Sequence, residues 1–321
     1  MEHWVLGRTG IRISALGMGT GGHKVLGQGA DKRPEAEMRQ LLHRAFDLGI
    51  NYFDTSPGYA DGGSERILGQ ALQDLPRDQV VISTKVALAG GHTDEVRIMR
   101  PDDVVESVEG SLRRLQIDTI DILLMAVAGP KYFDAVVTDL VPVLHRLRDR
   151  GKIRFIGSSE QSRSDGAHAW LKKILPTGLV DVAMVAHNLI NQSAQRTVFP
   201  VCRERSIGVA NVFAVRNLFG NPARLQEVIQ DLKRRGVLSG EPVPDTEPLG
   251  WLTEDGDARS LVEAAYRYAA FTEAVTTVLC GTIDAAKLEE NVAFMAKGPL
   301  AAPFINRLSR TFGHIEEPIG N

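Results

Sequence analysis

The chain has 321 residues, of which 43% are hydrophobic and 24% are charged, and its formal net charge is −3. These values are those of an ordinary globular protein, and the length suits either two modest domains or one large α/β barrel. The slightly negative charge argues against a general nucleic-acid binder, which needs a strong basic bias.

Cysteine usage and hydropathy argue against further classes. Cys202 and Cys280 form no CxxC pair, so we expect buried thiols rather than a disulfide framework or a zinc site. The N-terminal MEHWVLGRTG has no apolar stretch of signal-peptide length, and no run approaches the ~18 apolar residues of a membrane helix. We expect a cytoplasmic protein that acts on a small molecule, without nucleic-acid, membrane or metal partners. Nothing in the sequence indicates an oligomeric state.

Short β-rich runs alternate with helical patterns along the chain. Most of these runs are nearly continuously apolar, as expected for parallel strands covered on both faces. Strands are predicted at residues 14–20, 51–56, 80–86, 120–126, 153–159, 180–186, 208–214 and 276–282. Ser64 is the expected N-cap of the second helix. Amphipathic helices are predicted at residues 34–49, 63–75, 101–116, 138–152, 164–175, 193–206, 257–271 and 284–295.

This alternation, with no break in composition, predicts a (β/α)8 TIM barrel in which residues 1–321 form a single domain. The alternative is a doubly wound open sheet, but GMGTGGHK (17–24) lacks the third glycine of a phosphate-binding GxGxxG motif. One long connection, at about 215–257, contains an extra helical pattern at 221–236. It would lie at the C-terminal mouth of the barrel, where active sites are built.

Three polar residues are predicted to meet near this mouth. Asp54 ends the second strand, Tyr59 lies in the glycine-rich loop beyond it, and Lys85 ends the third strand. An ammonium beside a phenol favours the phenolate, and the carboxylate keeps the lysine charged and in place. Such a phenol can donate a proton to a developing alkoxide or stabilise an oxyanion. The alternative is a buried ion pair with a tyrosine packed nearby.

Several motifs, in the right order, resemble the aldo-keto reductase family over about residues 5–300. FDTSPGYADGGSERILGQAL is similar to the family's FDTAxxYGxSExxxGxxL, ISTKV matches the strand that carries its lysine, and GKIRFIGSSE is similar to GKIRxIGxSN. The resemblance implies a (β/α)8 barrel, NADPH as hydride donor and reduction of aldehydes or ketones to alcohols. By position, Tyr59 would be the general acid, with Lys85 and Asp54 as its partners.

The chain departs from the family at the substrate pocket. The family's catalytic histidine, five residues after the aspartate of DLyxxH, falls at Ala126, which follows Met125. In the family this histidine orients the carbonyl and shares in proton transfer. A substrate group could fill the gap, or a histidine from elsewhere could reach it, although for each candidate a structural role is the commoner one. The candidates near strand ends are His23, His92 and His187.

The nicotinamide side departs too. The family's Ser-Asn after the fifth strand reads Ser159-Glu160 here, and its glutamine on the sixth strand falls at Met184. Both substitutions weaken the expected clamp on the carboxamide. The family's stacking aromatic falls near Val212 or Phe213. Beyond it, Arg216 could meet the cofactor pyrophosphate as a charge-assisted donor.

The positions expected to bind the adenosine end of the cofactor match the family more closely. LEENVAFM resembles the family's C-terminal cofactor helix. By position, Gly281 and Thr282 would receive the 2′-phosphate, with Lys287 where the family places an arginine. Glu290 and Asn291 would hold adenine. Because lysine still supplies a positive charge, we favour NADP(H) over NAD(H).

Three functions remain open at this stage. The first is an NADP(H)-dependent oxidoreductase that interconverts a carbonyl and an alcohol. In the second, the same barrel uses Tyr59 for enolisation, elimination or isomerisation, with a recycled nicotinamide cofactor or none. The third is a non-catalytic protein that binds NADPH or a metabolite, against which the intact acid–base set argues.

Overall fold

The computed structural model describes residues 1–22, 24–29, 31–90, 97–127, 129–160, 165–238, 242–254 and 258–319. Parallel strands close into a barrel, because each pairs with the next in chain order and the last, β11, pairs with the first, β3. The predicted (β/α)8 barrel is therefore confirmed. Its strands are β3 (Leu16–Gly19), β4 (Tyr52–Asp54), β5 (Val81–Gly90), β7 (Ile120–Val127), β8 (Ile153–Ser159), β9 (Val182–Ala186), β10 (Gly208–Val212) and β11 (Thr277–Cys280).

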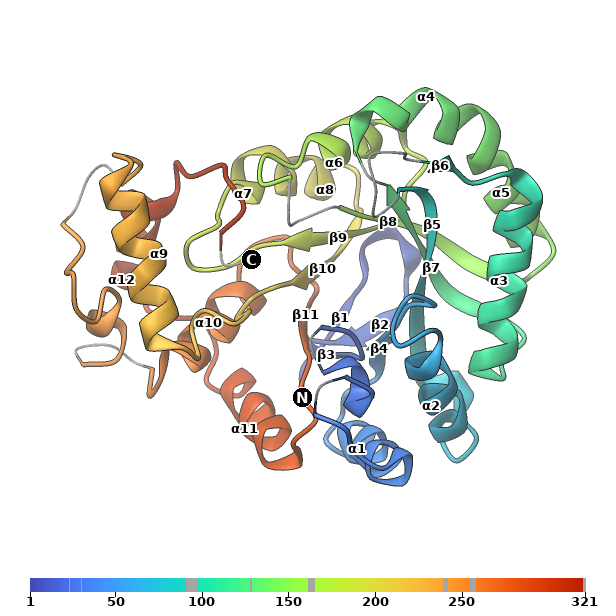
Figure 1. Ribbon diagram of the computed structural model, residues 1–321, viewed down its shortest axis with the longest axis horizontal. Coiled ribbons are helices and arrows are strands. Elements are labelled where there is room, and N and C mark those ends of the chain that lie inside the picture. Colours follow the sequence, from blue (N-terminus) through green and yellow to red (C-terminus); the bar gives the residue numbers. More distant parts are fainter. Residues whose placement is uncertain are drawn as a thin grey trace.

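Helices surround these strands (Figure 1). Among the described residues no helix is long and apolar enough to cross a membrane. A π-helical turn, Val136–Leu140, leads into α5, and a short strand, β6 (Arg97–Ile98), pairs with the end of β5. The helices are α1 (Glu35–Asp47), α2 (Gly63–Leu72), α3 (Pro101–Leu115), α4 (Phe133–Ala135), α5 (Val141–Asp149), α6 (Ala169–Ile174), α7 (Ala194–Thr197), α8 (Phe199–Glu204), α9 (Pro222–Arg234), α10 (Leu261–Ala270), α11 (Ala285–Met295) and α12 (Ala302–Phe312).

Alternate residues of each strand face opposite sides of the sheet, so the barrel sorts its side chains into two sets. One set packs between sheet and helices in an outer core that includes Met18, Phe53, Ile82, Met125 and Ala183. The other set fills the barrel interior. This inner cluster consists of Leu6, Ile13, Tyr52, Val81, Ile122, Leu124, Val182, Met184 and Ala210.

An antiparallel hairpin of β1 (His3–Val5) and β2 (Arg12–Ser14) covers the N-terminal end of the barrel. Its turn begins at Gly7, which has a φ of +49°. A Cβ on this glycine would clash with the backbone of Ser206 and Gly208 at the start of β10. The hairpin thereby places two residues of the inner cluster across the base of the barrel, which leaves the opposite end as the mouth.

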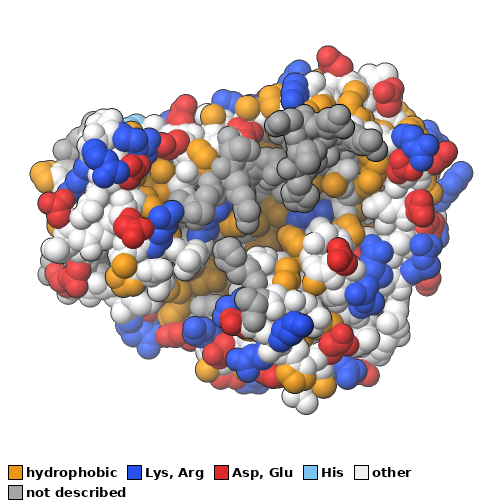
Figure 2. All heavy atoms as spheres, viewed as in Figure 1, with side chains coloured by type: hydrophobic (Ala, Val, Ile, Leu, Met, Phe, Trp, Pro, Cys, Tyr) orange, Lys and Arg blue, Asp and Glu red, His pale blue; other side chains and the backbone are white. Residues whose placement is uncertain are grey.

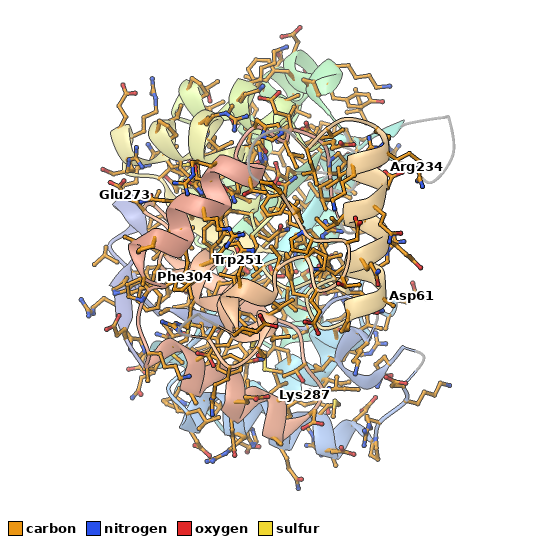
Figure 3. The ribbon with its side chains drawn as sticks, turned by 90° about the vertical axis from the view of Figure 1, so that its left-hand side faces the viewer. Asp61, Arg234, Trp251, Glu273, Lys287 and Phe304 are labelled. Atoms are coloured by element: carbon orange, nitrogen blue, oxygen red, sulfur yellow. The ribbon has the colours of Figure 1, made fainter. Side chains whose placement is uncertain are left out.

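The long connection at about 215–257 carries α9, which begins at Asn221, whose side chain accepts the backbone N–H of Arg224. The apolar side of α9 packs with α10 and α12 in a flanking cluster, distinct from the outer core, that includes Leu225, Ile229, Leu232, Leu308 and Phe312. Helices α9 and α12 both lie at the left end of the molecule in Figure 1. Trp251 stacks on Phe304 of α12 with 5.9 Å between ring centroids, and both are labelled in Figure 3. The described part of the connection therefore packs onto α10 and α12.

Several predicted boundaries were wrong. Ser64 does not cap α2: that helix begins at Gly63 after Gly62 in a left-handed conformation, and the Ser64 hydroxyl donates to the carbonyl of Thr20 instead. Strand β5 continues to Gly90, so Lys85 lies within the strand. The helix predicted at 193–206 divides into α7 and α8, with a proline at the start of the second. Helix α12 was not predicted.

A fully buried carboxylate ties α2 to the barrel and to α3. Glu65 accepts a hydrogen bond of 2.6 Å from the hydroxyl of Thr84 on β5, and its other oxygen lies 2.6 Å from Nε of Arg114. Both oxygens are thus satisfied, as a buried charge requires. Because α2 follows the loop that carries Tyr59, this carboxylate also fixes one end of that loop.

We predict that Glu65→Gln lowers the free energy of unfolding by about 2–4 kcal/mol, because it removes the charge that Arg114 neutralises. Urea denaturation followed by circular dichroism measures the loss. Glu289→Gln is the matched control, since its ion pair with Arg44 is solvent-exposed, and it should change stability by less than ~0.5 kcal/mol. Equal midpoints for the two variants would contradict the anchoring role of Glu65.

Candidate active site

The residues predicted to carry chemistry gather at the C-terminal ends of the barrel strands. Asp54 on β4 pairs in register with Ser83 on β5. Farther toward the mouth, one row crosses β5, β7, β8 and β9 and consists of Ala87, Ala126, Ser159 and Met184. Figure 2 shows a hollow near the middle of the molecule, with hydrophobic and basic side chains on its walls. The mouth is therefore accessible to a small molecule.

Asp54 and Lys85 form a tight ion pair beneath the mouth. Lys85 Nζ lies 2.8 Å from Oδ1 and 2.7 Å from Oδ2 of Asp54, and it donates to the carbonyl of Thr55 at 2.9 Å. Burial opposes the charged form of Lys85, but Asp54 and Tyr59 outweigh it, so the pKa of Lys85 lies above its ordinary value. Lys85 is therefore a fixed cation at neutral pH.

Tyr59 lies in the loop after β4 and is half-buried. The ammonium of Lys85 is 5.0 Å from the centroid of its ring. The ring also meets the backbone of Gly21, where a Cβ would lie 2.5 Å from Cζ and 2.9 Å from the hydroxyl oxygen of Tyr59. The phenol thus contacts a glycine and lies near a cation, with part of its surface open to solvent.

Such a phenol can exchange a proton with a substrate oxygen. A fixed cation nearby stabilises the phenolate that remains after the proton leaves, and the partly closed site strengthens this interaction. The structure brings Asp54, Tyr59 and Lys85 together as the sequence predicted. Their catalytic roles remain predictions.

In the structure, the position of the family's histidine holds only a small side chain that faces the mouth. Ala126 is half-exposed on the inward-facing side of β7, opposite the exposed Ala87 on β5. Met125 points the other way, is fully buried in the outer core, and so is not at the mouth. Two small methyl groups thus lie in register on adjacent strands at the mouth.

None of the three candidate histidines is seen to fill this gap. His23 and His92 lie outside the described residues. His187 is fully buried between the rings of Phe199 and Tyr268, and its Nε2 lies 3.2 Å from the hydroxyl of Thr272. Burial, together with the nearby His168, lowers the pKa of His187 to about 3. It is a neutral packing residue.

Of the residues predicted to bind the nicotinamide, Ser159 lies at the mouth, whereas the side chains of Met184 and Glu160 are held in other contacts. Ser159 is half-exposed at the mouth. Met184 fills the inner cluster, and the carboxylate of Glu160 accepts the backbone N–H of Ala186 at 2.7 Å. Of these three, only Ser159 presents a hydroxyl toward the mouth. The three side chains therefore do not form the clamp on the nicotinamide carboxamide that the family uses.

A buried acid–base pair was missed by the sequence reasoning. Glu160 Oε2 lies 2.6 Å from Nδ1 of His168, whose Nε2 lies 2.9 Å from the hydroxyl of Ser193. Burial raises the pKa of Glu160, although the hydrogen bond and the charge of His168 oppose this shift. The Ser193 hydroxyl also donates to the carbonyl of Gly166. The carboxylate of Glu160 thus connects the end of β8 to His168 and to Ala186 at the end of β9.

Phe213 follows β10 and is exposed, whereas Val212 faces the inner cluster. The guanidinium of Arg216 lies 3.6 Å from the centroid of the Phe213 ring. Arg216 also borders a water-sized cavity with His168 and Asn188. Phe213 is therefore an exposed aromatic just after a barrel strand, with the Arg216 guanidinium over its ring.

The predicted adenosine residues follow β11. A Cβ on Gly281 would lie 3.8 Å from the carbonyl oxygen of Gly19 and 3.9 Å from that of Gly21, so this loop borders the glycine-rich turn after β3. Thr282 is half-exposed. In α11, whose N-cap is Asp284, Lys287 and Glu290 are exposed and Asn291 is buried. The position of Lys287 on α11 is visible in Figure 3, and within the described parts of the chain no carboxylate pairs with it.

Curated relatives are oxidoreductases. The NADH-specific methylglyoxal reductase of Escherichia coli is 33% identical over 222 residues, which cover 65% of this chain and 66% of the relative. The L-galactose dehydrogenase of Arabidopsis thaliana is 28% identical over 306 residues, which cover 91% of this chain and 88% of the relative.

Solved structures share the fold. The holo form of an aldo-keto reductase from Bacillus halodurans superposes with a TM-score of 0.72 at 24% identity, with 96% of both chains covered. An aldo-keto reductase from Klebsiella pneumoniae, in complex with NADPH, superposes with a TM-score of 0.69 at 20% identity, with 100% of this chain and 99% of that chain covered. The family model described as the aldo/keto reductase family matches residues 15–311. The chain therefore belongs to the aldo/keto reductase family, and it is an oxidoreductase built on a (β/α)8 barrel.

Proposed function

We propose that the protein is an NADP(H)-dependent oxidoreductase that interconverts a carbonyl and an alcohol, with Tyr59 as general acid and base. The observation that carries this proposal is the set formed by Asp54, Lys85 and Tyr59 at the mouth. A half-exposed phenol beside a fixed ammonium has the properties that proton transfer to a substrate oxygen requires. Family membership supports the reaction class.

When bound, the nicotinamide cofactor supplies or accepts the hydride. In carbonyl reduction, the Tyr59 hydroxyl donates its proton to the substrate oxygen as negative charge develops there. Lys85 stabilises the phenolate that remains, and Asp54 holds Lys85 in position. In alcohol oxidation the phenolate accepts the proton instead, so the same group serves both directions.

The residues present fit a dinucleotide better at its adenosine end than at its nicotinamide end. Lys287 offers a cation, Thr282 a hydroxyl and Asn291 an amide near the glycine-lined turn after β11. We propose that Lys287 binds the 2′-phosphate, which favours NADP(H). At the other end Ser159 would contact the carboxamide, with Phe213 available to stack on the ring.

A second function is favoured by a specific observation. Ala126 supplies no second donor to the carbonyl site, and Glu160 and Met184 provide no amide for the nicotinamide. Tyr59 beside Lys85 could then catalyse enolisation, elimination or isomerisation without net hydride transfer. An assay that follows both cofactor oxidation and product structure distinguishes this from carbonyl reduction.

The test is a panel of methylglyoxal, 4-nitrobenzaldehyde and benzaldehyde with NADPH and NADH, and of L-galactose with the oxidised cofactors. We predict that Tyr59→Phe lowers kcat by about 10²–10⁴-fold, because it removes the proton donor. Tyr268→Phe is the control: it also loses a phenolic hydroxyl, which accepts a hydrogen bond from Gln195 on α7, and should keep its activity. Near-normal turnover by a folded Tyr59→Phe variant would place the proton donor elsewhere.

We also predict that Ala126→His increases kcat/KM for small aldehydes by about tenfold or more, since a second donor at the carbonyl oxygen is worth a few kcal/mol in such sites. The measurement is steady-state NADPH oxidation over the aldehyde panel. Ala126→Leu adds comparable bulk without a donor and should not show the gain. Equal rates for the histidine and leucine variants would refute this account of the gap.

A further inference from the structure

A connected set of four polar side chains crosses the largely apolar interior of the barrel. On β4 Tyr52 and Asp54 face inward, and on the neighbouring strand β5 Ser83 and Lys85 do so. Tyr52 and Ser83 are fully buried. Each lies two residues before the ion-pair residue of its own strand, farther from the mouth, so no substrate reaches it.

The four side chains form an unbroken chain of hydrogen bonds. The Tyr52 hydroxyl donates to Ser83 Oγ at 2.9 Å, and Ser83 Oγ donates to Asp54 Oδ1 at 2.8 Å. Since a serine hydroxyl has a single proton, the donation from Tyr52 directs that proton to the carboxylate. Burial, followed by the charge of Asp54, raises the pKa of Tyr52, so this phenol stays a donor at all physiological pH values.

The space for Tyr52 is provided by a glycine. A Cβ on Gly17 of β3 would lie 2.7 Å from Cδ1 of the Tyr52 ring. Any larger residue at this position would displace the ring and with it the hydroxyl that meets Ser83. The hydrogen bond between Tyr52 and Ser83 therefore depends on the absence of a side chain at Gly17.

Ser83 has a particular effect on the ion pair. Of the described residues, Ser83 and Lys85 are the two whose side chains donate to the Asp54 carboxylate. A lysine ammonium has three protons. Lys85 Nζ donates to both carboxylate oxygens of Asp54 and to the carbonyl of Thr55, and it lies 5.0 Å from the centroid of the Tyr59 ring. By bonding Oδ1 as well, Ser83 fixes the rotation of the carboxylate that holds the ammonium beside Tyr59.

We propose that Ser83, supported by Tyr52, is a positioning residue that orients Asp54 and, through Lys85, the proton donor Tyr59. This inference rests on the proposed function, because it assigns Ser83 a role only if Tyr59 transfers the proton. Ser83 and Tyr52 touch neither substrate nor cofactor. They act by holding the carboxylate in one orientation inside an apolar interior.

The test is a double-mutant cycle with Ser83→Ala and Tyr59→Phe, assayed with the aldehyde of the panel that turns over fastest. Ser83→Ala should lower kcat about tenfold with KM changed less than about twofold, as is typical when a supporting hydrogen bond is lost. Tyr52→Phe should lower kcat about threefold, because Ser83 remains but loses its orienting donor. In the Tyr59→Phe background, Ser83→Ala should have no further effect.

Thr277→Val is the matched control. The Thr277 hydroxyl is also fully buried in the barrel, close to Gly17, but no described residue hydrogen-bonds to it. Its removal should leave kcat unchanged. If Ser83→Ala keeps full kcat while Tyr59→Phe is inactive, the positioning role is wrong and the proposed function stands.

An equal loss of kcat from Ser83→Ala in both backgrounds would also overturn the positioning role, since it would reveal a general structural effect. Full activity of Tyr59→Phe would overturn the proposed function and the inference together. If Ser83→Ala does not fold, the same cycle with Tyr52→Phe gives the answer, with a threefold loss that disappears in the Tyr59→Phe background as the expected result.

Discussion

The ion pair between Asp54 and Lys85 is the constraint on which the site depends. Two charges inside a barrel lined by apolar side chains lose most of their hydration, and the pair persists only where further hydrogen bonds satisfy both partners. The carboxylate gains Ser83, and the ammonium gains the carbonyl of Thr55. Tyr59, half-exposed beside this pair, carries a proton that a substrate can reach.

Glycines in and after the first barrel strand make this arrangement possible. Gly17 leaves room for the buried ring of Tyr52, and Gly21 leaves room for the ring of Tyr59. The two phenols therefore lie above and below the ion pair, each against a stretch of backbone without a side chain. The loss of the family's histidine at Ala126 leaves this set intact and changes only what stands opposite the phenol.

The sequence predicted the barrel because its strands are short apolar runs of similar length, a pattern that few other folds produce. Asp54 and Lys85 were found because each charge interrupts such a run. Helix α12 was missed although its apolar residues at 304, 308 and 312 are spaced four apart, because no unit was expected after the eighth.

Other features of the site depend on long-range partners that one sequence does not reveal. Glu160 matched a cofactor-binding position by alignment, but its carboxylate meets His168, which stands in a left-handed turn. Met125 and Ala126 are adjacent in the chain, and only the alternation of β7 decides that Ala126 faces the mouth. The register between β4 and β5 pairs Ser83 with Asp54, and the sequence alone does not reveal that register.

The proposed function requires a nicotinamide dinucleotide at the mouth, and binding of NADPH and NADH to the purified protein tests this requirement most directly. The change in cofactor or tryptophan fluorescence on titration gives both dissociation constants. We expect saturable NADPH binding that is tighter than NADH binding, because Lys287 offers its charge to the 2′-phosphate. No binding of either cofactor at millimolar concentration would contradict it and would leave Tyr59 to proton chemistry without hydride transfer.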